Sequence, residues 1–133
     1  MTGLNTGPEP FFELLGLQTE EVKLDFCRMR MPFRPELQQA GGLVHGGAIA
    51  SLIDSAAVLA IKTGVAPGVT LFPTVTMTVN YLAAAREIDL IAKAHVIRRG
   101  RSMVFVDVDV ISPSDDAVAK GQVVCKLPSS RKS

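Results

Sequence analysis

Aromatic residues and cysteines are scarce in this chain of 133 residues. There is no tryptophan and a single tyrosine, whereas 47% of the residues are hydrophobic, so the interior must be built mainly from aliphatic side chains. The two cysteines, Cys27 and Cys125, lie near opposite ends of the sequence, outside any CxxC pair or histidine cluster. This placement favours two buried thiols in a reducing compartment over a disulfide or a zinc site.

An excess of charge of one sign is also lacking. Fourteen lysines and arginines oppose 13 aspartates and glutamates, which argues against nucleic-acid binding as the main function. Polar residues interrupt the longest apolar stretch, at Ser51, Asp54, Ser55 and Lys62, so a membrane span is not expected. The first ten residues have neither the basic nor the apolar region of a signal peptide. We therefore expect a cytoplasmic protein that binds neither nucleic acid nor membrane.

The length of the chain fits one domain, residues 1–133. Glycines and prolines interrupt residues 1–10, and residues 128–133 are polar, so we expect both ends to be loose. A core of this size is small, and self-association would bury further surface.

One segment, from Gly47 to Thr63, has the length and the three-and-four spacing of apolar residues that indicate a long helix. Apolar residues cover most of its circumference, which predicts a buried helix. A short helix is expected at 11–15, where Gly16 is the stop signal.

The remaining segments read as strands because apolar and polar residues alternate in them. They are 22–31 before the long helix, and 74–81, 88–97, 103–111 and 117–127 after it. The short connections between them require antiparallel pairing. The expected fold class is therefore α+β, with an antiparallel sheet wrapped around one long central helix. One sheet covers only one side of such a helix, so we expect at least a dimer.

The most informative stretch is the glycine-rich loop from Gly41 to Gly47, which leads into the long helix. Its glycines allow a sharp bend and a close approach to a ligand. The first turn of a helix has unpaired N–H groups and a positive potential, which could stabilise the oxygen that gains charge in an acyl transfer. Tight packing at the helix entry would explain the same glycines without any chemistry.

Asp54 is the one acidic residue in the long helix, and its neighbours are mostly apolar. A carboxylate in such surroundings is costly unless something pairs with it. Three explanations fit. Asp54 lies with Ser51 and Ser55 on a solvent-exposed stripe of the helix, it makes a hydrogen bond at a subunit interface, or it acts as a general base or nucleophile.

Together these residues resemble a known family. The pattern consists of Gln39, the His45-Gly46-Gly47 motif, Asp54 seven residues after Gly47, the strand from Thr74 to Leu82 and the basic turn from Arg98 to Ser102. It is similar to the hotdog-fold acyl-CoA thioesterases of the phenylacetate-degradation and 4-hydroxybenzoyl-CoA types. The resemblance covers nearly the whole chain, and it implies hydrolysis of an acyl-coenzyme A thioester.

The resemblance also implies residue roles. Asp54 would attack the thioester carbonyl or activate a water, and the N–H of Gly46 would polarise that carbonyl. Gln39 would lie near the thioester or the water, and Thr74 would help to hold the water. These groups would come from two subunits of a dimer, which could pair again into a dimer of dimers.

Further residues are assigned less directly. His45 would order the loop through hydrogen bonds, although its position also suggests a direct catalytic role. Contacts with the substrate and its coenzyme A phosphates would come from five residues: Gly47, Val75, Gly100, Arg101 and Ser102. Arginines also commonly decorate exposed hairpins, so this turn has a purely structural explanation as well.

No metal or separate cofactor is implied, because coenzyme A is part of the substrate and the helix terminus polarises the carbonyl. Two alternatives are a hydratase or dehydratase of the same fold and an acyl-CoA sensor without catalysis. No histidine lies within helical reach of Asp54, which disfavours the first, and the short chain holds no output module for the second. The acyl group is not readable from the sequence.

Overall fold

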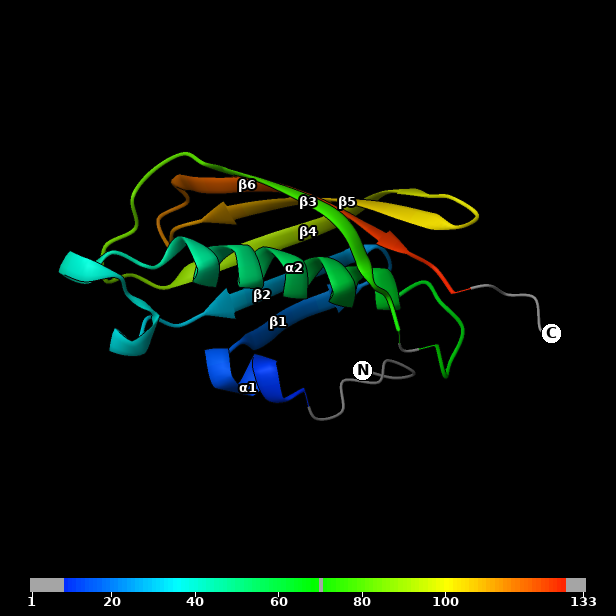
Figure 1. The fold of residues 1–133 in the computed structure, drawn as a ribbon, viewed down its shortest axis with the longest axis horizontal. Coiled ribbons are helices and arrows are strands. Elements are labelled where there is room, and N and C mark those ends of the chain that lie inside the picture. The colour runs from blue at the N-terminus through cyan, green and yellow to red at the C-terminus, as the bar shows by residue number, and fades with distance from the viewer. Residues whose placement is uncertain (1–8, 70, 129–133) are drawn as a thin grey trace.

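The computed structural model describes residues 9–69 and 71–128 (Figure 1). It contains two α-helices, two short 3-10 helices and six strands. In chain order they are α1 (Pro10–Leu15), β1 (Gln18–Lys23), β2 (Phe26–Met31), η1 (Pro35–Leu37), η2 (Ala40–Gly42), α2 (Gly46–Lys62), β3 (Thr74–Tyr81), β4 (Leu90–Arg99), β5 (Met103–Ile111) and β6 (Ala117–Lys126). The expected loose segments 1–8 and 129–133 lie outside the described residues.

The six strands form one antiparallel sheet in the order β1-β2-β4-β5-β6-β3, and α2 lies along one of its faces (Figure 1). The predicted α+β architecture, a sheet curved around one long helix, is therefore confirmed. The two edge strands are β1 and β3. The alternation along β5 is regular, with every second residue buried against the helix side.

Helix α2 is buried along most of its length, as the apolar pattern predicts. It lies close to the sheet at Gly121 on β6, where an added Cβ atom would be 2.6 Å from Cγ2 of Ile53. A glycine in the middle of a strand is otherwise unfavourable. Here it lets Ile53 and the adjacent Asp54 approach β6 and β3.

The segment expected as one strand, 22–31, is instead a hairpin of β1 and β2, so that prediction was wrong. The chain reverses at Leu24-Asp25, where Asp25 adopts a left-handed conformation with φ 65°. Aspartate tolerates this conformation better than most residues. The turn is also tied to the C-terminal end of α2, because the Asp25 N–H donates to Oγ1 of Thr63 over 2.8 Å.

Strand β3 departs from simple alternation at Val75. Thr74 pairs with Cys125 of β6 and Thr76 pairs with Val124, so Val75 is an extra residue, a β-bulge. The bulge moves Thr74 onto the inner face with Cys125, whereas unbroken alternation would place it on the outer face with Thr76.

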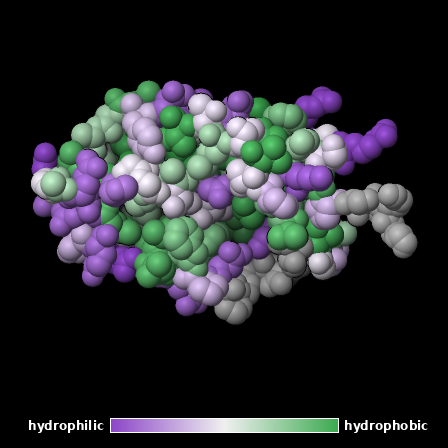
Figure 2. Space-filling model, in the orientation of Figure 1, coloured by the Kyte–Doolittle hydropathy of each residue, from purple (hydrophilic) through white to green (hydrophobic). Residues whose placement is uncertain are grey.

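The exposed large apolar side chains include one group on α1 and one on β3. The two groups are Phe11 and Leu14 on α1 and Val75, Met77 and Tyr81 on β3. Figure 2 shows the hydrophobic surface over α1, and Figure 1 shows β3 curving across α2 at the edge of the sheet. Both cysteines are buried, as expected. Within the described residues, no helix is long and apolar enough to cross a bilayer.

Candidate functional site

The N-terminus of α2 is built by His45, Gly46 and Gly47. His45 is the N-cap residue, and its Nδ1 accepts a hydrogen bond of 2.8 Å from the Gly47 N–H. Since Nδ1 accepts, the neutral ring carries its proton on Nε2. A side chain on Gly47 would meet this ring, because its Cβ would lie 3.0 Å from Nδ1. His45 therefore caps α2.

Among the described residues no acceptor pairs with the Gly46 N–H, whereas the neighbouring Gly47 N–H donates to the His45 cap. An unpaired N–H in the first turn of a helix is a hydrogen-bond donor in a region of positive potential. The family resemblance implies that this donor would polarise the thioester carbonyl.

A cleft of about 500 Å³ lies beside this donor. Its lining carries no charged side chain and is mostly apolar, and it consists of Gln39, Leu43, Val44, Gly46, Gly47, Ile49, Tyr81, Leu82 and Ala83–Ala85. Three residues predicted from the sequence, Gln39, Gly46 and Gly47, thus share one cleft. The backbone N–H of Gln39 donates to the Leu43 carbonyl over 2.8 Å, which folds the glycine-rich loop back on itself.

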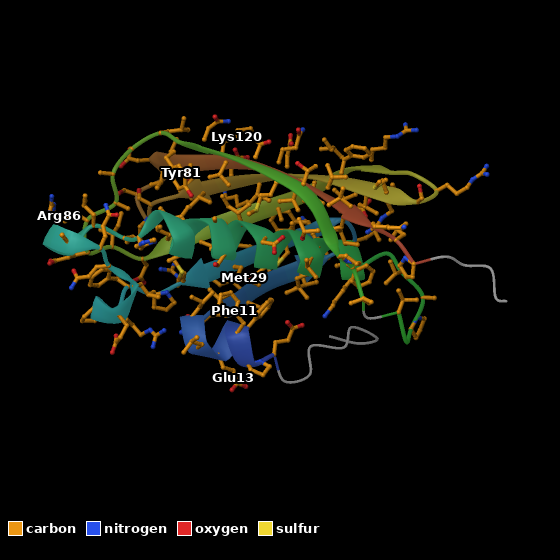
Figure 3. The ribbon with its side chains drawn as sticks, viewed as in Figure 1. Phe11, Glu13, Met29, Tyr81, Arg86 and Lys120 are labelled. Atoms are coloured by element: carbon orange, nitrogen blue, oxygen red, sulfur yellow. The ribbon has the colours of Figure 1, made fainter. Side chains whose placement is uncertain are left out.

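Tyr81, at the end of β3, also belongs to this cleft, and no sequence argument assigned it a role. Its hydroxyl donates to the Gly46 carbonyl over 2.8 Å, and its ring packs against Gly46 (Figure 3). The signal available in the sequence was that Tyr81 is the only tyrosine of the chain. Its contact with a loop 35 residues away could not be read from local pattern.

Asp54 lies in the middle of α2, half-buried, and bonds to β3. Oγ1 of Thr74 donates to its Oδ1 over 2.7 Å. The bulge at Val75 makes this possible, because it turns Thr74 toward the helix. The structure thus brings together the acid and the hydroxyl that the sequence singled out. Ser51 does not join them, because its hydroxyl donates to the Gly47 carbonyl within α2.

The acid and the glycine donor do not meet within one chain. Asp54 is eight positions after Gly46 on the same helix, which corresponds to about 12 Å along its axis. One carbonyl group cannot contact both at hydrogen-bond distance. The single chain therefore holds two half-sites, the cleft with Gly46 and the pair of Asp54 and Thr74.

The basic turn is at the opposite end of the molecule from the N-terminus of α2 (Figure 1). Arg101 and Ser102 are exposed there, and the Gly100 N–H closes the turn by donating to the Met103 carbonyl over 2.8 Å. Arg99 is different, because it bonds Asp25 and the Ile61 carbonyl at the end of α2. Arg99 thus has a structural role, whereas the Arg101 side chain points to solvent.

No cluster of three or more histidine, cysteine or acidic side chains that could hold a metal ion occurs in residues 9–69 and 71–128. The half-sites are made of backbone N–H groups, an amide, a hydroxyl and one carboxylate. Such groups suit acyl transfer, in which an oxygen gains negative charge and a water loses a proton.

A family model described as Thioesterase superfamily matches residues 41–119, which include Gly46, Asp54 and Thr74. The chain belongs to the thioesterase superfamily. The match covers the glycine-rich loop, α2, β3, β4, β5 and the start of β6. Gln39 and Cys125 lie outside it.

Relatives with names and structures agree with this membership. A provisionally named esterase of Halobacterium salinarum is 36% identical over 110 residues, covering 80% of this chain and 72% of the relative. Human acyl-coenzyme A thioesterase 13 is 33% identical over 88 residues, 63% of this chain and 58% of that protein. A mutant of the phenylacetic acid degradation protein PaaI from Thermus thermophilus superimposes with a TM-score of 0.80 at 23% identity, over 90% of this chain and 100% of that one. This likeness confirms the hotdog fold.

Proposed function

We propose that this thioesterase superfamily member hydrolyses acyl-coenzyme A thioesters in a site formed by two copies of the chain. The observation that carries the proposal is the separation of the two half-sites. Gly46 offers an unpaired donor beside an apolar cleft, and Asp54 bonds to Thr74 about 12 Å further along α2. A second α2 running antiparallel beside the first would bring the Asp54 of one copy to the Gly46 of the other.

The edge strand β3 supports pairing with a second copy. Its eight residues contain no charged side chain or proline, and its pairing within the chain is with β6 on one side only. Val75 and Met77 are exposed on it, and apart from the bulge at Val75 the strand lacks the charges and prolines with which natural proteins usually protect such an edge. A second β3 alongside would cover this edge and bring the two α2 helices together. Further pairing into a dimer of dimers stays a prediction.

The roles in the proposed reaction follow from the chemistry of each group. The thioester carbonyl accepts a hydrogen bond from the Gly46 N–H, and the acyl group lies in the uncharged cleft. Asp54 takes a proton from water, the water oxygen bonds to the carbonyl carbon, the carbon–sulfur bond breaks, and the proton passes to the leaving thiolate. Gln39 and Thr74 hold the thioester and the water, and Arg101 contacts the coenzyme A phosphates together with the Gly100–Ser102 turn.

The substrate class rests on two observations. The human relative is named an acyl-coenzyme A thioesterase, and the cleft beside Gly46 lacks charged side chains that would favour a charged acyl group. A screen of acyl-CoA esters with the wild type and Asp54→Asn tests it. We expect turnover of at least one apolar acyl-CoA and loss of nearly all activity in Asp54→Asn. Binding without turnover by the wild type would instead indicate a sensor.

The shared site has its own test, which uses two inactive variants. Gly46→Pro removes the N–H while placing proline at the first helical position, where it is well accepted. Gly46→Ala keeps the N–H and serves as its control. If the site combines Gly46 of one copy with Asp54 of the other, a refolded equimolar mixture of Gly46→Pro and Asp54→Asn recovers about one quarter of wild-type activity, because half of the dimers hold one intact site. A site within one chain would recover none.

A further inference from the structure

Cys125 adjoins the pair of Asp54 and Thr74, and neither the sequence analysis nor the proposed reaction gives it a role. It lies on β6 directly across from Thr74, with no exposed surface. Its Sγ is 3.7 Å from Oγ1 of Thr74, within the range of a hydrogen bond to sulfur. The contact exists because the bulge at Val75 places Thr74 on the inner face of β3.

The direction of this contact follows from counting protons. A threonine hydroxyl has one proton, and Oγ1 of Thr74 donates it to Oδ1 of Asp54 over 2.7 Å. An ionised carboxylate can only accept, so the proton of Thr74 is committed to Asp54. The hydroxyl oxygen then has only lone pairs to offer to sulfur, and the thiol must be the donor.

The surroundings of Cys125 keep that donor in place. Burial raises the pKa of the thiol above its ordinary value, and the negative charge of Asp54 also raises it. The group is therefore a neutral thiol at neutral pH, able to donate. A thiolate beside the Asp54 carboxylate would add a second negative charge to a half-buried site.

We propose that Cys125 is a positioning residue for hydrolysis: its thiol donates to Thr74, which fixes the Thr74 hydroxyl toward Asp54 and leaves one lone pair of that oxygen for the attacking water. The water can then give one proton to Asp54 while its other hydrogen is held by Thr74. This inference rests on the proposed function, because it concerns the same Asp54 and Thr74.

The chain provides a matched control in Cys27. Cys27 is the other cysteine, also without exposed surface, on β2, and burial raises the pKa of its thiol to about 12. Among the described residues it has no hydrogen bond to Thr74 or any other side chain. Replacing it with alanine removes the same atom from a different strand, away from Thr74.

The kinetic test compares Cys125→Ala, Cys125→Ser and Cys27→Ala, each checked for folding by thermal denaturation. We expect Cys125→Ala to lower kcat about threefold to tenfold with KM unchanged, which corresponds to the loss of one neutral hydrogen bond. Cys125→Ser keeps a donor and should recover most of that loss, and Cys27→Ala should keep wild-type kcat. In a Thr74→Val background, Cys125→Ala should cause no further loss.

A second readout does not depend on turnover. In Cys27→Ala only the Cys125 S–H stretching band remains in the infrared spectrum, and a donating thiol absorbs at lower frequency than a free one. Adding Thr74→Val should shift this band to higher frequency. Any one of three results overturns the positioning role. They are an infrared band that Thr74→Val does not shift, a wild-type kcat in Cys125→Ala, and a loss of kcat in Cys27→Ala equal to that in Cys125→Ala. Absence of turnover in the wild type overturns the proposed function instead, and the infrared shift still decides whether the thiol donates.

Discussion

The hydroxyl of Tyr81 donates a hydrogen bond to the backbone carbonyl of Gly46, with 2.8 Å between the two oxygens. The bond joins the end of the edge strand β3 to the first residue of α2. It fixes the orientation of the peptide unit next to the unpaired Gly46 N–H, and the tyrosine ring forms one wall of the cleft. The same residue therefore links the half-site to the strand that we propose as the dimer interface.

Tyr81→Phe separates the hydroxyl from the ring. We expect kcat to fall about threefold to tenfold, since the variant loses one neutral hydrogen bond that holds the Gly46 carbonyl in place. KM should change little because the ring still lines the cleft. Tyr81→Leu removes the ring as well and should raise KM in addition. Steady-state kinetics on the best acyl-CoA substrate check both, and a wild-type kcat in Tyr81→Phe would exclude the hydroxyl from positioning Gly46.

Replacement of His45 distinguishes a helix cap from a catalytic base. Its Nδ1 accepts from the Gly47 N–H, and the oxygen of an asparagine can do the same. We expect His45→Ala to lower the free energy of unfolding by about 1 kcal/mol, and His45→Asn to stay close to the wild type in stability and activity. Denaturant titration and turnover measure these effects. If His45→Asn is as inactive as Asp54→Asn, the ring itself takes part in the reaction.

Much of the fold was predictable from local patterns, because the signals were strong. The apolar residues of α2 are spaced for a helix over 17 residues, and β5 buries every second side chain. Two features of the fold were not predicted, because local patterns do not specify them. The turn at Leu24-Asp25 contains no glycine, and the bulge at Val75 is specified by pairing with β6 rather than by its own residues.

The candidate site was predictable in part for the same reason. His45, Gly46 and Asp54 lie close in sequence, so a motif can report them. The contacts of Tyr81 with Gly46 and of Cys125 with Thr74 join residues 35 and 51 positions apart. Only the folded sheet brings such pairs together.

A lysine on the exposed part of β3 tests the proposed interface. Met77 is 37% exposed in the single chain, and Met77→Lys would add a positive charge to each of the two β3 strands at the proposed interface. We expect the variant to sediment near the 14.2 kDa of one chain and to lose activity while keeping its secondary structure. Thr19→Lys, on the exposed edge strand β1, is the control and should keep both assembly and activity. A monomeric wild type, or a dimeric and active Met77→Lys, would contradict the interface.

An isotope experiment decides how Asp54 acts. If Asp54 activates water, a single turnover in H2(18)O places the heavy oxygen in the free acid at once. If Asp54 attacks the carbonyl and labelled water then attacks the γ-carbon of Asp54 in the enzyme-bound mixed anhydride, the first product molecule carries an unlabelled oxygen from the carboxylate, and the label stays on Asp54. Because the Thr74 hydroxyl donates to Oδ1 of Asp54, Oδ2 is available either to take a proton from water or to attack the carbonyl. We expect label in the first turnover, measured by mass spectrometry with enzyme in excess.

Glu20 on β1 gives a pH dependence of stability that is separate from the site. Its two oxygens accept from Arg28 over 2.9 Å and from Arg30 over 2.6 Å, and the bond to Arg30 is the main reason that the pKa of Glu20 lies below its ordinary value of 4.5. Just below pH 4.5, the Glu20 carboxyl is therefore protonated less often in the folded state than in the unfolded state. The stabilisation is present above pH 4.5 and is lost as the pH falls through the folded pKa.

Glu20→Gln measures this contribution. The variant should be less stable than the wild type at pH 7, by no more than about 1 kcal/mol because these side chains remain partly solvated. The difference should shrink toward zero as the pH falls to about 3. Glu21→Gln, whose side chain is 51% exposed and 3.7 Å from Lys23, is the matched control and should show a smaller effect. Thermal melts across this pH range check the prediction, and a difference between wild type and Glu20→Gln that persists undiminished at low pH would contradict it.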